Sequence, residues 1–159
     1  MEVPKHYFLV KGKGEGISKL VSFEMALRDA GIHPFNLVKV SSIMPPNCIQ
    51  ITKEEGINLL KEGAIVYTVL AVNSSNEKGK TIGAGVGLAI PSDGSFGYFS
   101  EYESENENEE ETSKKAENLA RIMLSSLKGE KLVKDSLGIA ECAKVSDQWT
   151  SVIAAVVFV

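Results

Sequence analysis

The chain has 159 residues, of which 43% are hydrophobic and 24% are charged, a composition typical of one globular domain with a full core. Its net charge of −4 argues against nucleic acid as the main partner, because phosphate binding needs a basic surface. MEVPKHYFLV is too polar for a signal peptide, and no apolar run reaches the roughly 18 residues of a membrane span. Cys48 and Cys142 lie far apart in the sequence, so we expect plain thiols in a reducing cytoplasm.

The first half of the chain predicts short strands and two helices. Leu20, Phe23 and Leu27 recur at helical spacing, and Gly31 is a typical helix stop. In chain order, the predicted elements are a strand at 6–10, a GKGEG loop at 12–16, a helix at 18–30, a strand at 36–40, a short helix at 53–61 and an apolar strand at 64–72.

The second half is predicted to contain a hairpin, one long helix and two final strands. NSSNEKGK at 73–80 has the composition of a hairpin loop, so the strand at 81–90 is expected to return beside 64–72. Next come a PSDGS turn at 91–95, a strand at 97–103, a helix at 113–128, and strands at 137–145 and 151–159. Strands outnumber helices, which favours an α/β or α+β sandwich with a largely antiparallel sheet, forming a single domain over 1–159.

Three patterns that resemble ligand sites are interpreted as structural. GKGEG lacks the G-x-G-x-x-G spacing and further βαβ units, so a flexible loop is favoured over a nucleotide site. His6 and His33 lack metal-ligand spacing, and no metal is expected. The acidic stretch SENENEEE at 104–111 is interpreted as a solvated loop leading into a helix whose N-terminal dipole favours acids, rather than as a cation or partner site.

Glu101 and Glu103 alternate with Tyr102 on a predicted strand, so both carboxyl groups should point to one face. On an internal face, such a carboxyl can hold its proton near neutral pH and donate it as a general acid. From the residues alone, a pair at the surface is the favoured interpretation.

The stretch LVKVSSIMPP, from Leu37 to Pro46, delivers two adjacent serines from an apolar strand into two prolines. A turn or a helix N-cap is the usual role of such serines. Here the prolines restrict φ and remove two N–H donors, and Met44 is pushed out of the helical region. The context therefore indicates a backbone that is held in place around Ser41 and Ser42.

The sequence resembles the pyruvoyl-dependent arginine decarboxylases over nearly its whole length. The resemblance is carried by SFEMALRDAGI at 22–32, NLVKVSSIMPP at 36–46, TIGAGVGLAIP at 81–91 and SEYE at 100–103. It implies a four-layer αββα sandwich that decarboxylates L-arginine to agmatine and CO₂, an entry to polyamine synthesis.

The resemblance also implies a proenzyme that cleaves itself between Ser41 and Ser42, giving a β chain of residues 1–41 and an α chain of residues 42–159. The Ser42 hydroxyl would attack the Ser41 carbonyl, and elimination and hydrolysis would leave a covalent pyruvoyl group derived from Ser42. That group would serve as the electron sink, so no external cofactor is needed. The side chain of Asn36 would donate to the developing oxyanion.

The remaining site residues are also implied by the resemblance. Glu101 matches the proton donor, Glu24 matches the position that meets the substrate guanidinium, and Ser41 and Ile43 complete the substrate-binding set. The family forms trimers, sometimes paired to hexamers, with sites between subunits, so a homotrimer or hexamer is expected.

Two departures from the family pattern keep the substrate open. Glu24 stands where the family usually has aspartate, and His33-Pro34 stands where smaller residues are expected. The alternatives are a pyruvoyl decarboxylase for another amino acid, or an uncleaved paralogue without catalytic activity. Retention of Ser42, Asn36 and Glu101 together argues against the paralogue.

Overall fold

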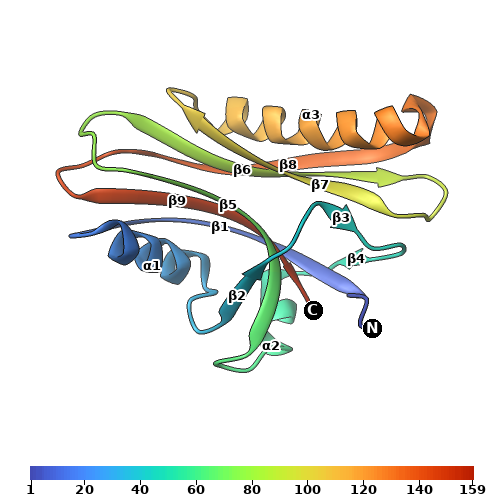
Figure 1. The fold of residues 1–159 in the computed structure, drawn as a ribbon, viewed down its shortest axis with the longest axis horizontal. Coiled ribbons are helices and arrows are strands. Elements are labelled where there is room, and N and C mark those ends of the chain that lie inside the picture. Colours follow the sequence, from blue (N-terminus) through green and yellow to red (C-terminus); the bar gives the residue numbers. More distant parts are fainter.

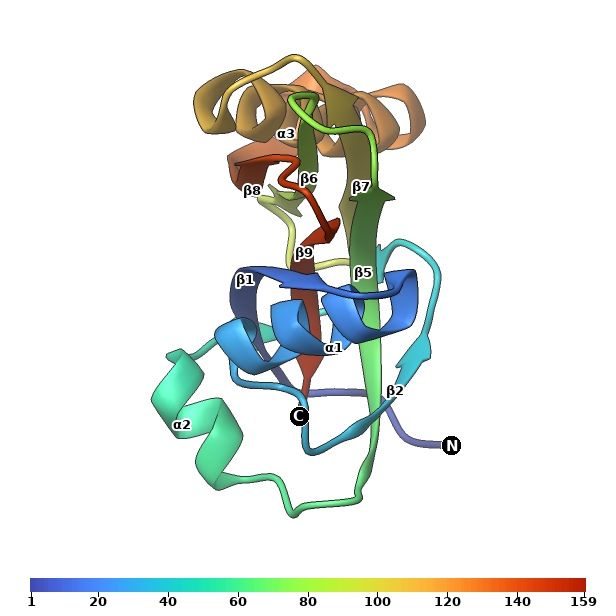
Figure 2. The ribbon, with the colours of Figure 1, turned by 90° about the vertical axis from the view of Figure 1, so that its left-hand side faces the viewer.

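The computed structural model describes residues 1–159 and contains two stacked β-sheets, each covered on its outer face by a long helix (Figures 1 and 2). Most strand pairs are antiparallel; the β2–β5 and β1–β4 pairs are parallel. This arrangement confirms the predicted sandwich. No helix is both long enough and apolar enough to span a membrane, and both cysteines are free thiols.

The first sheet has the strand order β2-β5-β9-β1-β4. Its strands are β1 (His6–Gly16), β2 (Asn36–Lys39), β4 (Ile49–Gln50), β5 (Ile65–Ser75) and β9 (Trp149–Phe158). Helix α1 (Lys19–Ala30) covers its outer face, and the short helix α2 (Lys53–Asn58) lies at one end (Figure 1). The hydroxyl of Ser18 caps α1, and Gly31 ends the helix, as predicted, with a left-handed φ of 82°.

The second sheet has the strand order β3-β7-β6-β8, and all its pairs are antiparallel. Its strands are β3 (Ile43–Met44), β6 (Thr81–Pro91), β7 (Gly97–Glu105) and β8 (Val133–Lys144), with α3 (Glu109–Lys128) and a 3₁₀ turn (Glu130–Leu132). Asn108 caps α3, and three glutamates of the acidic stretch form its first turn. Those residues are therefore helix rather than loop, at the end where the helix dipole favours negative charge.

The predicted hairpin, in which the strand at 81–90 returns beside the strand at 64–72, is wrong. β5 pairs with β2 and β9 in the first sheet, whereas β6 pairs with β7 and β8 in the second. The loop after Ser75 thus carries the chain from one sheet to the other (Figure 1). Its composition correctly indicates a turn, but turn composition does not specify which strands become neighbours.

The predicted GKGEG loop is also wrong, because β1 continues through it to Gly16. A Cβ added at Gly12 or Gly14 would overlap the backbone of Ala26 in α1. These glycines therefore let the helix lie directly on the strand, and their alternation follows the two-residue period of β-structure. β6 uses the same device, since a Cβ at Gly87 would overlap the backbone of Ala116 in α3.

The main core lies between the sheets and supports the strands that carry the serine pair. Tyr7, Phe99 and Met44 are almost fully buried there. The rings of Tyr7 and Phe99 meet edge to face with their centroids 5.1 Å apart. Aromatic packing thus fixes β7, the strand that pairs with β3, relative to β1.

Candidate active site

The Ser41-Ser42 link joins the edge of one sheet to the edge of the other. Before the link, the N–H of Val40 donates to the Thr68 carbonyl at 2.9 Å and continues the ladder of β2. After it, the N–H of Phe99 donates to the Ser42 carbonyl at 2.7 Å, at the start of the β3–β7 pairing. Both sheets therefore hold the link, one on each side.

The segment after the link is also anchored. Met44 is only 3% exposed and occupies the inter-sheet core, and the N–H of Cys48 closes a turn on the Pro45 carbonyl at 3.2 Å. Neither serine has a left-handed φ; the positive value in this segment belongs to Asn47, at 57°. Hydrogen bonds and burial, rather than left-handed backbone at the serines, fix the link in place.

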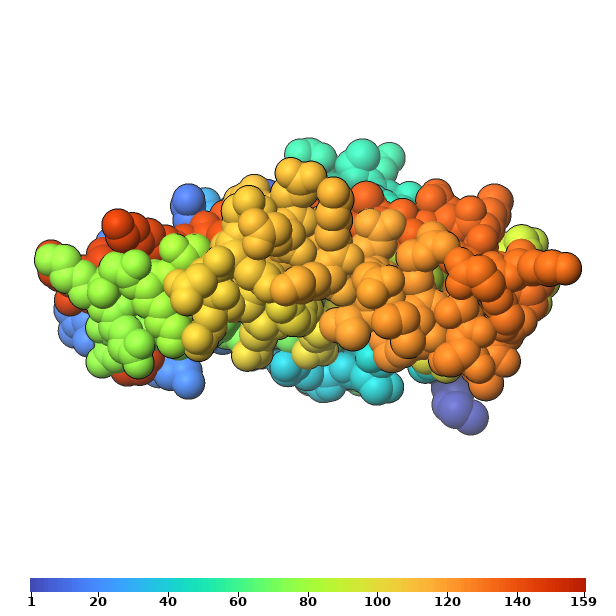
Figure 3. Space-filling model, turned by 90° about the horizontal axis from the view of Figure 1, so that it is seen from above, coloured from blue at the N-terminus to red at the C-terminus, as the bar shows by residue number.

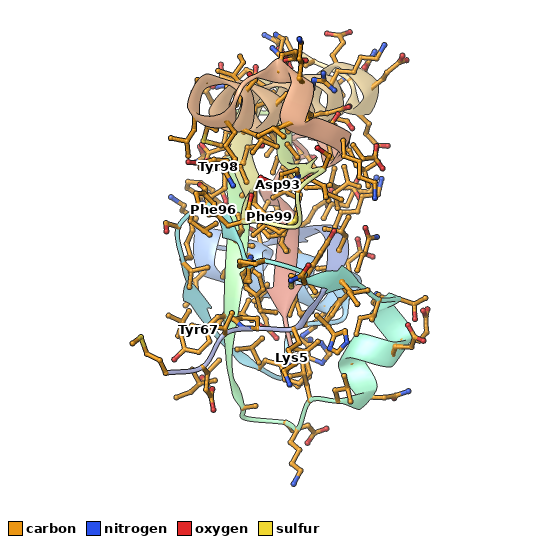
Figure 4. All side chains as sticks on the ribbon, turned by 90° about the vertical axis from the view of Figure 1, so that its right-hand side faces the viewer. Lys5, Tyr67, Asp93, Phe96, Tyr98 and Phe99 are labelled. Atoms are coloured by element: carbon orange, nitrogen blue, oxygen red, sulfur yellow. The ribbon has the colours of Figure 1, made fainter.

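A cavity of about 900 Å³ lies beside the link. Val40, Ser41, Ile43 and Pro45 form one wall, and most of the other lining residues come from the N-terminal segment, β5 and the C-terminal end of the chain. Figure 4 labels two lining residues, Lys5 and Tyr67, in the lower part of the molecule below Phe99. Because the lining is mainly apolar and carries a few charged groups, the cavity suits a small molecule with an aliphatic stem and polar ends.

The β2–β3 segment reaches the molecular surface. In Figure 3 it forms a cyan strip along one long side of the molecule, beside the α3 layer. Ser41 is exposed and Ser42 is half-buried. The first serine of the link therefore has room to move, while the second is held against the protein.

Glu101 lies across the link on β7. Its carboxylate pairs with Lys39, the last residue of β2, with 3.5 Å between Oε2 and Nζ. Ser100 and Ser104 bond toward α3, so Glu101 and Glu103 point to the opposite, inner side of β7, as the alternation predicts. The Glu101 side chain is 34% exposed, so the pair sits at the open edge of the sandwich, in agreement with the favoured surface interpretation.

Two of the predicted site residues do not join this group within one chain. Asn36 begins β2 and donates its side-chain amide to the Gly63 carbonyl at 2.9 Å. It precedes Ser41 by five residues of extended chain, which corresponds to roughly 16 Å. Glu24 lies on α1, where it pairs with Arg28 at 2.9 Å. The oxyanion role of Asn36 and the substrate role of Glu24 stay predictions.

Burial controls the other titratable groups near β3. It raises the pKa of the Cys48 thiol to about 11 and that of the Tyr7 hydroxyl to about 12. The thiol is therefore protonated at neutral pH and is a poor nucleophile. This leaves the serine hydroxyls as the candidate nucleophiles of the link.

Lys39 and the backbone of Phe99 are site groups that the sequence interpretation did not include. Alternation along a strand places Lys39 and Ser41 on the same face, which was a usable signal for the lysine. The N–H of Phe99 had no such signal, because it reaches Ser42 only through the β3–β7 pairing, and β3 has two residues.

Known proteins resemble this chain over nearly its whole length. The profile of the family described as "Pyruvoyl-dependent arginine decarboxylase" matches residues 6–159. A protein of that name from Methanocella arvoryzae is 48% identical, with 99% of this chain and 96% of the relative covered. Pyruvoyl-dependent arginine decarboxylase 1 of Methanosarcina acetivorans is 45% identical with the same coverage, and the Thermoplasma volcanium protein is 43% identical over 99% and 97%. The chain belongs to the pyruvoyl-dependent arginine decarboxylase family.

Proposed function

We propose that this protein is a self-processing carboxy-lyase that converts L-arginine to agmatine and CO₂. The observation that carries the proposal is the two-sided anchoring of the Ser41-Ser42 link, with Glu101 placed across it. The names of the relatives support arginine as the substrate and a pyruvoyl prosthetic group. We take Ser42 as the source of that group.

The residues at the link fit a pyruvoyl group formed in place. The Ser42 hydroxyl attacks the Ser41 carbonyl, and the C–N bond breaks as the ester forms. Loss of the Ser42 α-proton then expels the ester oxygen and leaves a carboxylate on Ser41. Hydrolysis at residue 42 takes up one water and releases one ammonia. The bond from Phe99 holds the Ser42 carbonyl during these steps, and the exposed Ser41 is free to separate.

When present, the pyruvoyl group supplies the electron sink for loss of CO₂. The protein's own task is then to place the substrate and return a proton. Glu101 is the proposed proton donor, because it is a carboxylic acid on β7, two residues after Phe99, whose N–H holds the Ser42 carbonyl. The cavity lined by Ser41 and Ile43 is the proposed place for the substrate's aliphatic stem.

We further propose that the protein forms a homotrimer, or a pair of trimers, in the cytoplasm. In this assembly, neighbouring chains complete the active site. Within one chain, Glu24 and Asn36 are bonded elsewhere, so a neighbour is the natural source of these groups at the link. The edge around the cavity also exposes large apolar side chains of β2, β3 and β5, namely Val38, Ile43, Ile65 and Tyr67. Association of copies along this edge would cover them.

Denaturing mass spectrometry tests self-processing. The wild-type chain should give fragments 1–41 and 42–159, the second lighter by one ammonia than a chain that begins with serine. Ser42→Ala should remain a single chain, because it lacks the oxygen that attacks and later leaves. Ser41→Ala is the matched control and should still cleave, since it keeps the Ser42 hydroxyl. An intact wild-type chain, or cleavage of Ser42→Ala, would contradict the proposal.

A panel of amino acids tests the substrate. Arginine should be consumed and agmatine formed, while lysine and ornithine, which lack the guanidinium, should react much more slowly. A preference for another amino acid in fully processed protein would support the sister decarboxylase, with Glu24 and His33-Pro34 as the first positions to exchange. A chain that stays uncleaved and turns over none of them would favour the paralogue without catalytic activity.

A further inference from the structure

Lys39 and Glu101 form an ion pair that spans the proposed cleavage site. Lys39 ends β2 in the first sheet and belongs to fragment 1–41, whereas Glu101 lies on β7 in the second sheet and belongs to fragment 42–159. Lys39 is the cation that contacts Glu101 in the uncleaved chain. The Lys39–Glu101 ion pair is therefore a feature of the uncleaved chain, in which the Ser41-Ser42 bond is intact.

Cleavage changes the charge next to this pair. The neutral peptide group of Ser41 becomes a carboxylate, only two residues after Lys39. The bond from Val40 to Thr68 shows that the strand is still extended at this point. The carboxylate forms on the main chain of Ser41, and two residues of strand span roughly 7 Å, a distance comparable to the length of a lysine side chain. The Lys39 ammonium can thus reach the new carboxylate without leaving its strand.

The existing pair is poorly placed to resist such an exchange. Its side chains are 55% and 34% exposed, and ion pairs in that setting are weak. Other charged groups face Ser41 across the cavity, namely Glu2, Lys5 and His6 of the N-terminal segment. Lys39 differs from them because it shares the strand of Ser41 and already lies at the link.

We propose that Lys39 is a positioning residue that exchanges partners on self-cleavage, leaving Glu101 for the carboxylate formed on Ser41. The exchange rests on the proposed function, because it needs cleavage at Ser41-Ser42. It makes cleavage itself the event that releases Glu101. It also neutralises a carboxylate that would otherwise lie beside residue 42, where the carboxylate of an amino-acid substrate must approach.

A pair of crystal structures tests the exchange directly. In the uncleaved Ser42→Ala protein, the Lys39 ammonium should remain on Glu101, near the 3.5 Å found here. In the processed protein, it should lie within ion-pair distance of the Ser41 carboxylate and away from Glu101. A processed protein in which Lys39 still contacts Glu101, or in which Lys5 holds the Ser41 carboxylate, overturns the inference.

Kinetics of fully processed Lys39→Met provide a second readout. The unneutralised Ser41 carboxylate should repel the substrate carboxylate and raise KM for arginine about tenfold. That repulsion is relieved as CO₂ leaves, so kcat should not fall. Lys39→Arg should restore KM, because it returns the positive charge. Lys78→Met is the matched control, because Lys78 belongs to an exposed ion pair with Asp147 and should change neither constant.

The two failures are distinguishable. If mass spectrometry finds the wild-type chain intact, both the proposed function and the exchange are contradicted. If the wild-type protein is processed but the Lys39→Met variant keeps a normal KM, the exchange is contradicted and the proposed function is not. A large loss of kcat at unchanged KM also contradicts the exchange, because it shows that Lys39 supports Glu101 during turnover.

Discussion

Single residues on β2, β3 and β7 determine what the serine link can do. The Phe99 N–H holds the Ser42 carbonyl, Met44 anchors the following strand in the core, and Lys39 faces Glu101 across the link. The three contacts are a hydrogen bond, a buried apolar side chain and an ion pair. Single substitutions can therefore separate formation of the cofactor from later turnover.

Glu101→Gln is expected to separate those two stages. The variant should still cleave between Ser41 and Ser42, because the attacking hydroxyl is unchanged. Its kcat in processed protein should fall by roughly 10²- to 10⁴-fold, the usual contribution of a placed proton donor. Glu103→Gln is the matched control on the same face of β7 and should retain most activity. Equal rates for the two variants would remove Glu101 from the role of donor.

Glu141 gives a residue-scale prediction for stability. Its carboxyl on β8 is buried, with the residue only 8% exposed, and burial followed by the hydrogen bond with Glu109 raises its pKa. A carboxyl whose pKa is higher in the folded state stabilises the fold at low pH, and this contribution is lost as the pH rises through the folded pKa. Lys11 lies beside the pair, 3.4 Å from Glu109, and reduces this loss without removing it.

Glu141→Gln should therefore raise Tm at pH 8 by roughly 2–4 °C and leave it nearly unchanged at pH 4. Thermal unfolding at both pH values measures the effect. Glu110→Gln is a suitable control, since Glu110 is exposed on α3 and pairs with Lys114. A lower Tm for Glu141→Gln at pH 8 would show that the ionised carboxylate stabilises the fold.

At the scale of elements, close contact between helix and strand organises both halves of the sandwich. Alternating glycines on β1 and β6 let α1 and α3 pack directly on the strand backbone. The sequence shows these glycines clearly, but glycine in isolation also indicates a loop. For GKGEG, that ambiguity produced the wrong prediction, which only the position of Ala26 above Gly12 and Gly14 resolves.

Gly87→Ala should destabilise the protein more than Gly85→Ala. A Cβ at Gly87 would overlap the backbone of Ala116, which cannot move without shifting α3, and overpacking of this kind costs roughly 1–3 kcal/mol. At Gly85 the nearest atoms are 3.2 Å away, so a small adjustment suffices. Denaturant unfolding of the two variants gives the comparison, and equal midpoints would contradict the close-packing explanation.

Elements were predicted well where one segment carries its own signal. The helix at 18–30 has a capping serine, an apolar stripe and a terminal glycine, and the structure places it within one residue of that range. The two-residue strands β3 and β4 carry no such pattern, and the partners of β5 and β6 depend on contacts distant in sequence. For the same reason, the motif around Ser41-Ser42 was visible in the sequence, whereas the Lys39–Glu101 contact was not.

At the scale of the whole molecule, residues 1–41 supply two strands of the first sheet, β1 inside it and β2 at its edge. β1 lies between β9 and β4, and it pairs with β9 from Tyr7 to Gly16. Phe8 and Val10 of β1 are buried in the core beneath α1. Removing this segment would expose that core, so cleavage should not separate the fragments.

Native mass spectrometry should therefore detect both fragments in one particle, in equal numbers. Urea or guanidinium should separate them only at concentrations that unfold the sandwich. Free fragment 1–41 in gel filtration of native protein would contradict the arrangement. Precursor Ser42→Ala provides the control, because its two segments remain covalently joined.

The two ends of the chain also lie at the cavity beside the link. Residues 2–6 and Val159 line it together with Ser41, and His6 and Val159 exchange two backbone hydrogen bonds of 3.0 Å. The proposed cleavage site and the two ends of this chain thus meet at one place, which favours a tolerated circular permutation. A gene that begins at residue 42, runs to 159 and continues through a short linker into 1–41 would encode the same sandwich with no bond to cleave. Such a permutant would show whether the sandwich forms independently of self-cleavage.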